Sequence, residues 1–228
     1  GAQDFRFIGG SFGAASGEAF IAGAQYAIEK VLQLGGKVLT ASDSSGFIYD
    51  KDGIDSEKLK HIMELKNEKR VRISEYVKKY SKAEFYSKKS PWNIKCDIAI
   101  PCATENELDK EDSISLIKNG CIAVGEGANM PCTPDAVKQF IKNKVLYAPG
   151  KASNAGGVAV SGLEMAQNSL KYTWTRDVVD GKLKEIMSDI HTSCVKYGST
   201  KDEINYLKGA NIAGFVKVAD AMLAQGVV

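Results

Sequence analysis

The sequence predicts an α/β fold, in which a mostly parallel β-sheet is covered by helices and followed by a helical C-terminal extension. Short apolar segments typical of buried strands alternate with amphipathic segments of helical period. Three of the strand-like segments run into loops rich in glycine, proline and polar residues, and from residue 161 onward the chain becomes purely helical. Together these features are typical of an α/β domain with added helices.

The first half of the chain alternates strands and helices. The strands predicted here cover residues 5–8, 37–41 and 83–86. A helix over residues 18–34 lies between the first two strands and ends at two glycines, Gly35 and Gly36. Phe47 to Tyr49, with the Asp-Lys-Asp-Gly segment that follows, indicates a turn. Asp55 then suits the N-cap of a charged helical region that extends to about Tyr80.

The second half repeats this alternation and then changes. The strands predicted here cover residues 96–101, 121–124 and 145–147, and helices at about 109–119 and 134–142 separate them. Three further helices are expected at about 161–172, 175–197 and 211–225. Terminal helices after a parallel sheet suggest that the chain returns toward another domain.

Each strand of the second half is followed by a loop with the chemistry of a binding site. These loops cover residues 101–108, 125–131 and 150–161, and they carry Thr104, Asn129 and Asn154. Glycine lets backbone approach a ligand closely, and threonine and asparagine offer both donors and acceptors. Because parallel strands end at one edge of a sheet, the loops are expected to converge on a small-molecule site. On composition alone, the third loop is equally compatible with a tight turn that binds nothing.

A second polar group follows the strand at residues 37–41. Asp43 stands where an acid bonds the adenosine-ribose 2′-hydroxyl in dinucleotide-binding folds, about 20 residues beyond a glycine. Ser44 follows it, and Lys66 and Arg72 come in the next helical region. Cations that fold back onto this strand end would suit a 2′-phosphate, which favours NADP over NAD. The alternative for these cations is a solvated helix face.

Composition excludes several classes of protein. The 228 residues carry a formal net charge of +2, which gives no electrostatic case for binding nucleic acid or a membrane surface. Five cysteines without CxxC spacing argue against a disulfide framework and a zinc site, so we expect no metal. The sequence has no signal peptide and no apolar run of about 18 residues. We therefore expect a soluble cytoplasmic protein with reduced thiols.

Six segments carry a resemblance to a known family. They are AQYAIEK (24–30), LTASDSSG (39–46), DIAIPCATENEL (97–108), GEGANMP (125–131), APGKASNAGGVAVSGLEMAQNS (148–169) and GANIAGFVKVADAMLAQG (209–226). From Ala24 to Val228 the chain resembles the cofactor-binding domain of the hexameric NADP-specific glutamate dehydrogenases. The resemblance implies a Rossmann-like, doubly wound sheet with helices on both faces. It implies a dinucleotide-binding domain at residues 24–200 and a C-terminal helical segment at 201–228 that returns toward a substrate domain.

The resemblance also implies roles for individual residues. Those expected to bind the NADP cofactor are Asp43, Ser44, Lys66, Arg72, Cys102, Ala103, Thr104, Asn129 and Asn154. Asp43 and Ser44 match contacts to the adenosine ribose and the 2′-phosphate. Val158 and Ser161 match positions that face the glutamate substrate, with the serine bonding its side-chain carboxylate.

Family members transfer a hydride between the nicotinamide and the substrate α-carbon, in the amination of 2-oxoglutarate or the deamination of L-glutamate. Their catalytic lysines and aspartate belong to an N-terminal substrate domain whose motifs are absent from this sequence. We therefore expect no catalytic residue in this chain, no amination by the chain alone, and a monomer or weak dimer instead of the family's hexamer.

Residues 1–23 depart from the family pattern. Members carry G-S-G-N just before the AQYAIEK helix, whereas here Phe20 and Ile21 would block the backbone approach of a pyrophosphate. A glycine-rich stretch from Gly9 to Gly17 lies upstream and does not fit G-x-G-x-x-G. Two alternatives stay open: the equivalent domain of another amino-acid dehydrogenase, or a non-catalytic or engineered scaffold with weakened dinucleotide binding. Ser161 favours glutamate over the first alternative.

Overall fold

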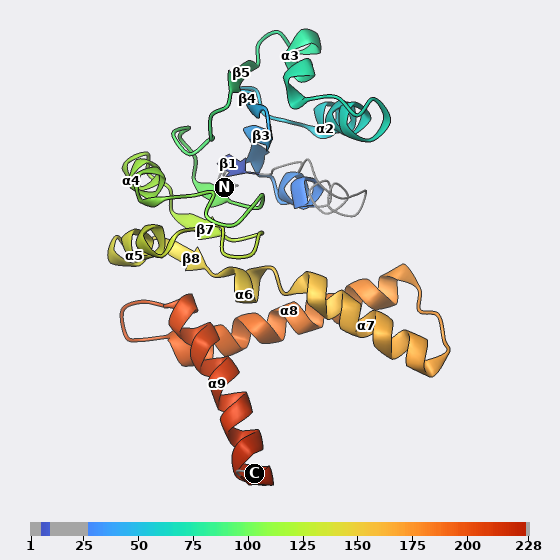
Figure 1. Cartoon of the computed structure of the whole chain (residues 1–228), viewed down its shortest axis with the longest axis vertical. Coiled ribbons are helices and arrows are strands. Elements are labelled where there is room, and N and C mark those ends of the chain that lie inside the picture. Colours follow the sequence, from blue (N-terminus) through green and yellow to red (C-terminus); the bar gives the residue numbers. More distant parts are fainter. Residues whose placement is uncertain (1–5, 10–26, 227–228) are drawn as a thin grey trace. The chain divides into compact units, whose positions relative to one another are not determined.

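The computed structural model describes residues 6–9 and 27–226 of the chain (Figure 1). Contacts divide the chain into two compact units, Gly1–Val145 and Leu146–Val228. The helix predicted over residues 18–34 is helical from residue 27 to residue 33, and its earlier part lies outside the described residues.

The first unit is built around a parallel sheet, as the sequence predicts. Its strands are β1 (Arg6–Gly9), β2 (Lys37–Val38), β6 (Ile98–Ile100) and β7 (Ala123–Gly125), in the order β2-β1-β6-β7. β1 pairs in parallel with β2 on one side and with β6 on the other, and Gly9 lies opposite Ile100. The chain therefore changes the direction in which the sheet grows at β1. In open α/β sheets, ligands bind outside the carboxyl ends of the strands at such a point.

A second, antiparallel sheet in the same unit corrects one prediction. Its strands are β3 (Thr40–Asp43), β4 (Gly46–Tyr49) and β5 (Glu84–Ser87), in that order. The turn predicted over Phe47 to Tyr49 is wrong, because these residues form β4. Phe47 is buried, and its ring stacks on Tyr86 of β5 with 4.8 Å between centroids. Apolar and aromatic side chains of this kind favour strands, so packing between strands explains the difference.

The helices described in the first unit lie at about the predicted places, but the single charged helical region that was predicted is divided into four segments. These helices are α2 (Ser56–Met63), η1 (Glu64–Glu68), η2 (Ile73–Glu75), α3 (Tyr76–Lys79), α4 (Lys110–Lys118) and α5 (Pro134–Lys142). Asp55 caps α2 by accepting the Lys58 backbone N–H, as predicted. The charged helical region is interrupted after η1, where Arg70 has a positive φ of 51°. Figure 1 shows α4 and α5 side by side.

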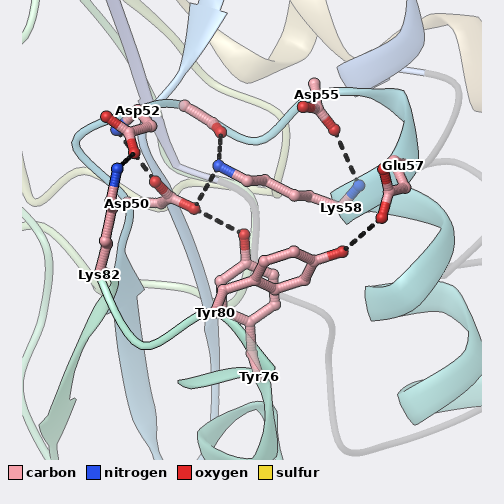
Figure 2. Close-up of polar contacts among 9 residues, drawn as sticks. Asp50, Asp52, Asp55, Glu57, Lys58, Tyr76, Tyr80 and Lys82 are labelled. Atoms are coloured by element: carbon pink, nitrogen blue, oxygen red, sulfur yellow. Dashed lines mark hydrogen bonds and ion pairs between the residues drawn. The ribbon is translucent and has the colours of Figure 1, made fainter. Parts of the chain in front are cut away.

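A buried ion pair ties the turn after β4 to the helices of the same unit (Figure 2). Asp50, whose side chain is 3% exposed, accepts the Tyr76 hydroxyl at 2.7 Å and pairs with the Lys58 ammonium at 2.8 Å. Lys58 also donates to the carbonyl oxygen of Gly53 at 2.8 Å. Burial, and then the hydrogen bond to Asp50, raise the pKa of Tyr76 far above its ordinary value. Tyr76 therefore stays a hydrogen-bond donor at neutral pH, and the network fixes α2 and α3 relative to β4.

The second unit is almost entirely helical. It contains β8 (Leu146–Ala148), α6 (Gly150–Ser153), α7 (Gly156–Leu170), α8 (Arg176–Gly198) and α9 (Tyr206–Gln225). Both α7 and α9 contact α8 (Figure 1). The three terminal helices are confirmed, although α7 and α9 begin earlier than predicted.

The loop predicted over residues 150–161 is wrong, because α6 and the first turns of α7 occupy it. Glycine in a helix costs only about 1 kcal/mol relative to alanine, so packing can override it. Helix α7 contacts α8, and Gly156 faces Leu183 of that helix, where a Cβ atom would make an ordinary contact of 3.6 Å with the Leu183 Cδ1 atom.

Helices α8 and α9 approach each other most closely at two glycines. A Cβ atom on Gly209 would overlap the backbone carbonyl of Cys194, and one on Gly198 would overlap the carbonyl of Asn205. Backbone atoms cannot swing aside as the end of a side chain can. Both positions therefore require glycine for the observed packing of α9 on α8.

We predict that Gly209→Ala destabilises the second unit, because its new methyl group must displace helix backbone. Overpacking of this kind costs about 1–3 kcal/mol, which exceeds the gain of up to about 1 kcal/mol from better helix propensity. Gly214→Ala, on the same helix where a Cβ atom would meet nothing within 4 Å, is the matched control and should be neutral or stabilising. Urea unfolding of both variants measures the difference, and equal stabilities would contradict the packing described.

Candidate functional site

Two of the three expected loops lie side by side. The loop after β6 and the loop after β7 are joined by backbone hydrogen bonds from Asn106 N to Met130 O at 3.0 Å and from Leu108 N to Pro131 O at 2.9 Å. A third bond runs from Gly127 N to Pro101 O at 2.9 Å. The convergence predicted from the strand ends is therefore confirmed for these two loops, both of which belong to the first unit.

The residues expected at the cofactor cleft occupy these loops. Cys102 and Ala103 are half-buried, whereas Thr104 and Asn129 are exposed. A Cβ atom on Gly127 would come within 2.7 Å of the Cys102 Cβ atom. Glycine at this position thus allows the second loop to lie directly against the first.

The remaining expected residues belong to the second unit. Asn154 is half-buried at the end of α6, where its N–H donates to Gly150 O at 2.9 Å. Val158 and Ser161 lie on α7, and both are exposed. The Ser161 hydroxyl donates to the carbonyl oxygen of Gly157 at 3.3 Å, within its own helix. The convergence of this segment with the first two loops stays a prediction.

Glu107 is a residue of the first loop that the sequence analysis missed. Its Oε1 atom accepts the Ala103 N–H at 2.7 Å, and the carboxylate also accepts the N–H of Thr104. Its own carbonyl oxygen accepts the indole N–H of buried Trp92 at 3.1 Å. Burial raises the pKa of Glu107 to about 7, although the two backbone hydrogen bonds favour the ionised form. The sequence does not distinguish this residue from Glu105, which is exposed in the same loop.

Glu126 plays a comparable part in the second loop. It is 4% exposed, and its Oε1 atom accepts the backbone N–H of Cys132 at 3.2 Å, which links the two ends of the loop. Burial, and then the charge of Glu126 and a hydrogen bond to it, raise the pKa of the Cys132 thiol far above its ordinary value. Cys132 therefore remains a neutral thiol and is a poor nucleophile.

The polar group after β3 also comes together as expected, around the Asp43 carboxylate. Its Oδ1 atom accepts the N–H and the hydroxyl of Ser45, at 2.8 and 2.6 Å. Its Oδ2 atom accepts the Lys66 ammonium and the N–H of Ile73, both at 2.9 Å. Burial opposes ionisation, but these bonds outweigh it and hold the pKa of Asp43 below its ordinary value. A carboxylate has about four acceptor positions, so internal donors occupy those of Asp43.

Two residues of this group reach the surface. Ser44 and Arg72 are both exposed, and the Arg72 guanidinium donates to the Ser44 hydroxyl. The side chain of Lys66, by contrast, is only 10% exposed, and its ammonium also donates to the carbonyl oxygen of Val71 at 3.2 Å. The exposed guanidinium and hydroxyl together offer hydrogen-bond donors to an anion such as a phosphate.

The expectations about metals, disulfides and membrane spans concern the whole chain, and the structure bears on part of it. All five cysteines carry free thiols. Among residues 6–9 and 27–226, no cluster of three or more histidine, cysteine or acidic side chains is arranged to hold a metal ion. Over the same ranges, every helix is too short or too polar to cross a membrane.

We predict that Asp43→Ala destabilises the first unit by about 3–5 kcal/mol at neutral pH, since it leaves the Lys66 charge buried without its counter-ion. Because the folded pKa of Asp43 is lowered, this stabilisation is present above the ordinary pKa of aspartate, about 4, and disappears as the pH falls through the folded value. The stability gap between wild type and variant should therefore narrow in acid.

The control is Asp52→Ala, which removes an exposed carboxylate 3.6 Å from the Lys82 ammonium. It should change stability by no more than about 1 kcal/mol at any pH. Thermal unfolding of the three proteins at several pH values makes the measurement. A similar loss in both variants at neutral pH would refute the part assigned to Asp43.

Comparison with known proteins identifies the family to which this chain is similar. The model of the Glutamate/Leucine/Phenylalanine/Valine dehydrogenase family matches residues 17–226. Glutamate dehydrogenase of Bacteroides thetaiotaomicron is 62% identical over 206 residues, which are 90% of this chain and 46% of that protein. NADP-specific glutamate dehydrogenase of Haemophilus influenzae is 55% identical with the same coverage. Other relatives have names that specify NADP, NAD(P) or NAD.

Solved structures agree with the sequence comparison. The crystal structure of Plasmodium falciparum glutamate dehydrogenase superposes with a TM-score of 0.87 at 46% identity, covering 97% of this chain and 46% of that one. The chain thus spans about half the length of the relatives it matches. It belongs to the Glutamate/Leucine/Phenylalanine/Valine dehydrogenase family.

Proposed function

We propose that this chain is the dinucleotide-binding part of an NADP-dependent glutamate dehydrogenase, an oxidoreductase that interconverts L-glutamate and 2-oxoglutarate. The observation that carries the proposal is 53–62% identity, over about 90% of the chain, to proteins named as glutamate dehydrogenases. We assign no catalytic residue to these 228 residues, so dinucleotide binding is the activity expected of them. Hydride transfer is the chemistry of the nicotinamide, and the protein orients it and sets its electrostatics.

The adenosine end of the cofactor is proposed to bind at the Ser44–Arg72 pair. An exposed guanidinium beside a hydroxyl suits the doubly charged 2′-phosphate of NADP, which NAD lacks. Lys66 adds a positive charge nearby, although Asp43 already neutralises it in part. Because internal donors fill the acceptor positions of Asp43, we assign it to holding Ser45, the residue after Ser44, and Lys66 in place. Asp43 could accept a hydrogen bond from the ribose only if one of its internal donors moved away.

The nicotinamide end is proposed to bind at the loops after β6 and β7, which carry Cys102, Ala103, Thr104 and Asn129. Asn154 is proposed to approach the nicotinamide ribose, and Val158 and Ser161 the glutamate substrate, on the strength of the family resemblance. We further propose that the parallel sheet is doubly wound. Gly9–Gly17 begins where β1 ends, the place at which such sheets carry their phosphate-binding turn, and all of it beyond Gly9 lies outside the described residues.

We propose the same division of the chain as the resemblance implies, with an atypical segment at 1–23, a dinucleotide-binding domain at 24–200 and a C-terminal segment at 201–228. The complete protein is proposed to form the family's hexamer in the cytoplasm, and this chain alone to be a monomer or weak dimer. The free state of its cysteines is compatible with that compartment.

Titration with NADPH and NADH, followed by nucleotide fluorescence, tests the proposed function. Wild type should bind NADPH more tightly than NADH. Arg72→Gln should weaken NADPH binding by about 10-fold or more, as expected for a lost charge-assisted bond to phosphate, and should change NADH binding by less than about 2-fold. Arg70→Gln, an exposed guanidinium two residues away, is the matched control.

Two outcomes would contradict the proposal. Wild type that binds neither nucleotide would support the alternative of a scaffold with impaired dinucleotide binding. An Arg72→Gln variant that loses NADPH and NADH equally would show that Arg72 does not read the 2′-phosphate.

A further inference from the structure

The loop that carries Ala103 and Thr104 is organised by a charged group on its inner side. Glu107 is only three residues beyond Thr104, and its carboxylate turns back to accept the N–H groups of both Ala103 and Thr104. The same residue is anchored through its carbonyl oxygen to the indole of Trp92, which is 2% exposed. A fixed side chain therefore defines the direction of two consecutive loop amides.

We propose that Glu107 is a positioning residue for the nicotinamide end of the dinucleotide site, where its carboxylate fixes the backbone at Ala103 and Thr104 against the loop after β7. This inference rests on the proposed function and deepens it. It assigns to Glu107 an effect on the nicotinamide half of the ligand and none on the adenosine half, which is proposed to bind at Ser44 and Arg72.

The hydrogen-bond donors around Glu107 explain why a carboxylate suits this position in the loop. A hydrogen bond to an ionised acceptor is roughly twice as strong as one to a neutral acceptor, and a carboxylate can accept from two amides at once. The loop that Glu107 holds pairs with the loop after β7 at two places. Leu108 forms a β-bridge with Cys132, and the Asn106 N–H donates to the Met130 carbonyl oxygen. Movement of the Ala103–Thr104 backbone would therefore also shift the loop that carries Asn129.

The loop after β7 carries titratable groups near Glu107. The Cys132 thiol lies near enough to feel the charge of Glu107 as well as that of Glu126. Glu126 is buried and Glu107 is half-buried, and burial of the thiol together with these two negative charges keeps Cys132 protonated. Burial raises the pKa of Glu107 to about 7, so this carboxylate exchanges its proton near neutral pH.

The positioning effect should therefore depend on pH. Above pH 7 the ionised carboxylate accepts both amides strongly, and the loop is held. Below pH 7 one oxygen carries a proton and becomes a donor, so the bonds to Ala103 and Thr104 weaken. Affinity for the nicotinamide half of the ligand should fall accordingly.

The test compares NADPH with 2′,5′-ADP, which keeps the adenosine and the 2′-phosphate but lacks the nicotinamide. Dissociation constants are measured at pH 6 and pH 8 for wild type, Glu107→Gln and the control Glu105→Gln, after circular dichroism has shown that all three are folded. The 2′-phosphate of both ligands titrates near pH 6, and so does the 5′-phosphate of 2′,5′-ADP, which is a monoester only in that ligand. These contributions are the same for all three proteins, so the comparison between the proteins removes them.

We expect the ratio of NADPH to 2′,5′-ADP affinity to fall by about 3-fold or more from pH 8 to pH 6 in wild type and in Glu105→Gln, as expected for the loss of charge-assisted bonds. These falls are measured relative to the change of the same ratio in Glu107→Gln, which reports only the titration of the ligands, since glutamine does not titrate. Glu107→Asp keeps the carboxylate, but its shorter side chain cannot reach the Ala103 N–H. This variant should therefore bind NADPH more weakly than wild type.

The contrary results distinguish failure of the positioning role from failure of the proposed function. An identical pH profile of the ratio in wild type and Glu107→Gln, or an equal effect of Glu107→Gln on both ligands, overturns the positioning role. If wild type binds 2′,5′-ADP, the proposed function survives that failure. If wild type binds neither ligand, the proposed function itself fails.

Discussion

The structure of the candidate site depends on buried or half-buried carboxylates that accept backbone N–H groups from their own loops. Asp43 holds the turn after β3 and the start of η2, Glu107 holds the loop after β6, and Glu126 closes the loop after β7. A buried carboxylate is costly unless hydrogen bonds or an opposite charge compensate it. Here the compensation comes from loop amides, and at Asp43 also from the Ser45 hydroxyl and the Lys66 ammonium, so the bonds that satisfy the acid also fix the loop.

Much of the architecture follows from local sequence features. The parallel strands, the Asp55 cap and the three terminal helices were predictable, because period and capping act over a few residues. The errors came from packing between distant segments. Phe47 belongs to a strand that pairs with β5, where Tyr86 lies beside it, and Gly156 belongs to a helix that packs on α8, where Leu183 lies beside it. Neither neighbour can be recognised from the residues that adjoin it in the sequence.

The clustering of the candidate residues was predictable from the sequence, whereas the hydrogen bonds within the clusters were not. Asp43, Ser44, Lys66 and Arg72 come together although up to 30 residues of sequence separate their partners, and the loops after β6 and β7 adjoin as expected. The carboxylate of Asp43 proved to be saturated by internal donors, and Glu107 was missed. Sequence spacing places an acid near a site, but it does not say whether the acid faces the ligand or its own backbone.

Amide hydrogen exchange tests most directly whether carboxylates hold these loops. The N–H groups of Ser45, Ile73, Ala103 and Cys132 each donate to a side-chain carboxylate. The account predicts that they exchange at least about 100-fold more slowly than the same residues in an unstructured peptide, as amides do when opening of the structure is unfavourable. Exchange of these four amides at the unstructured rate in the folded protein would contradict the account.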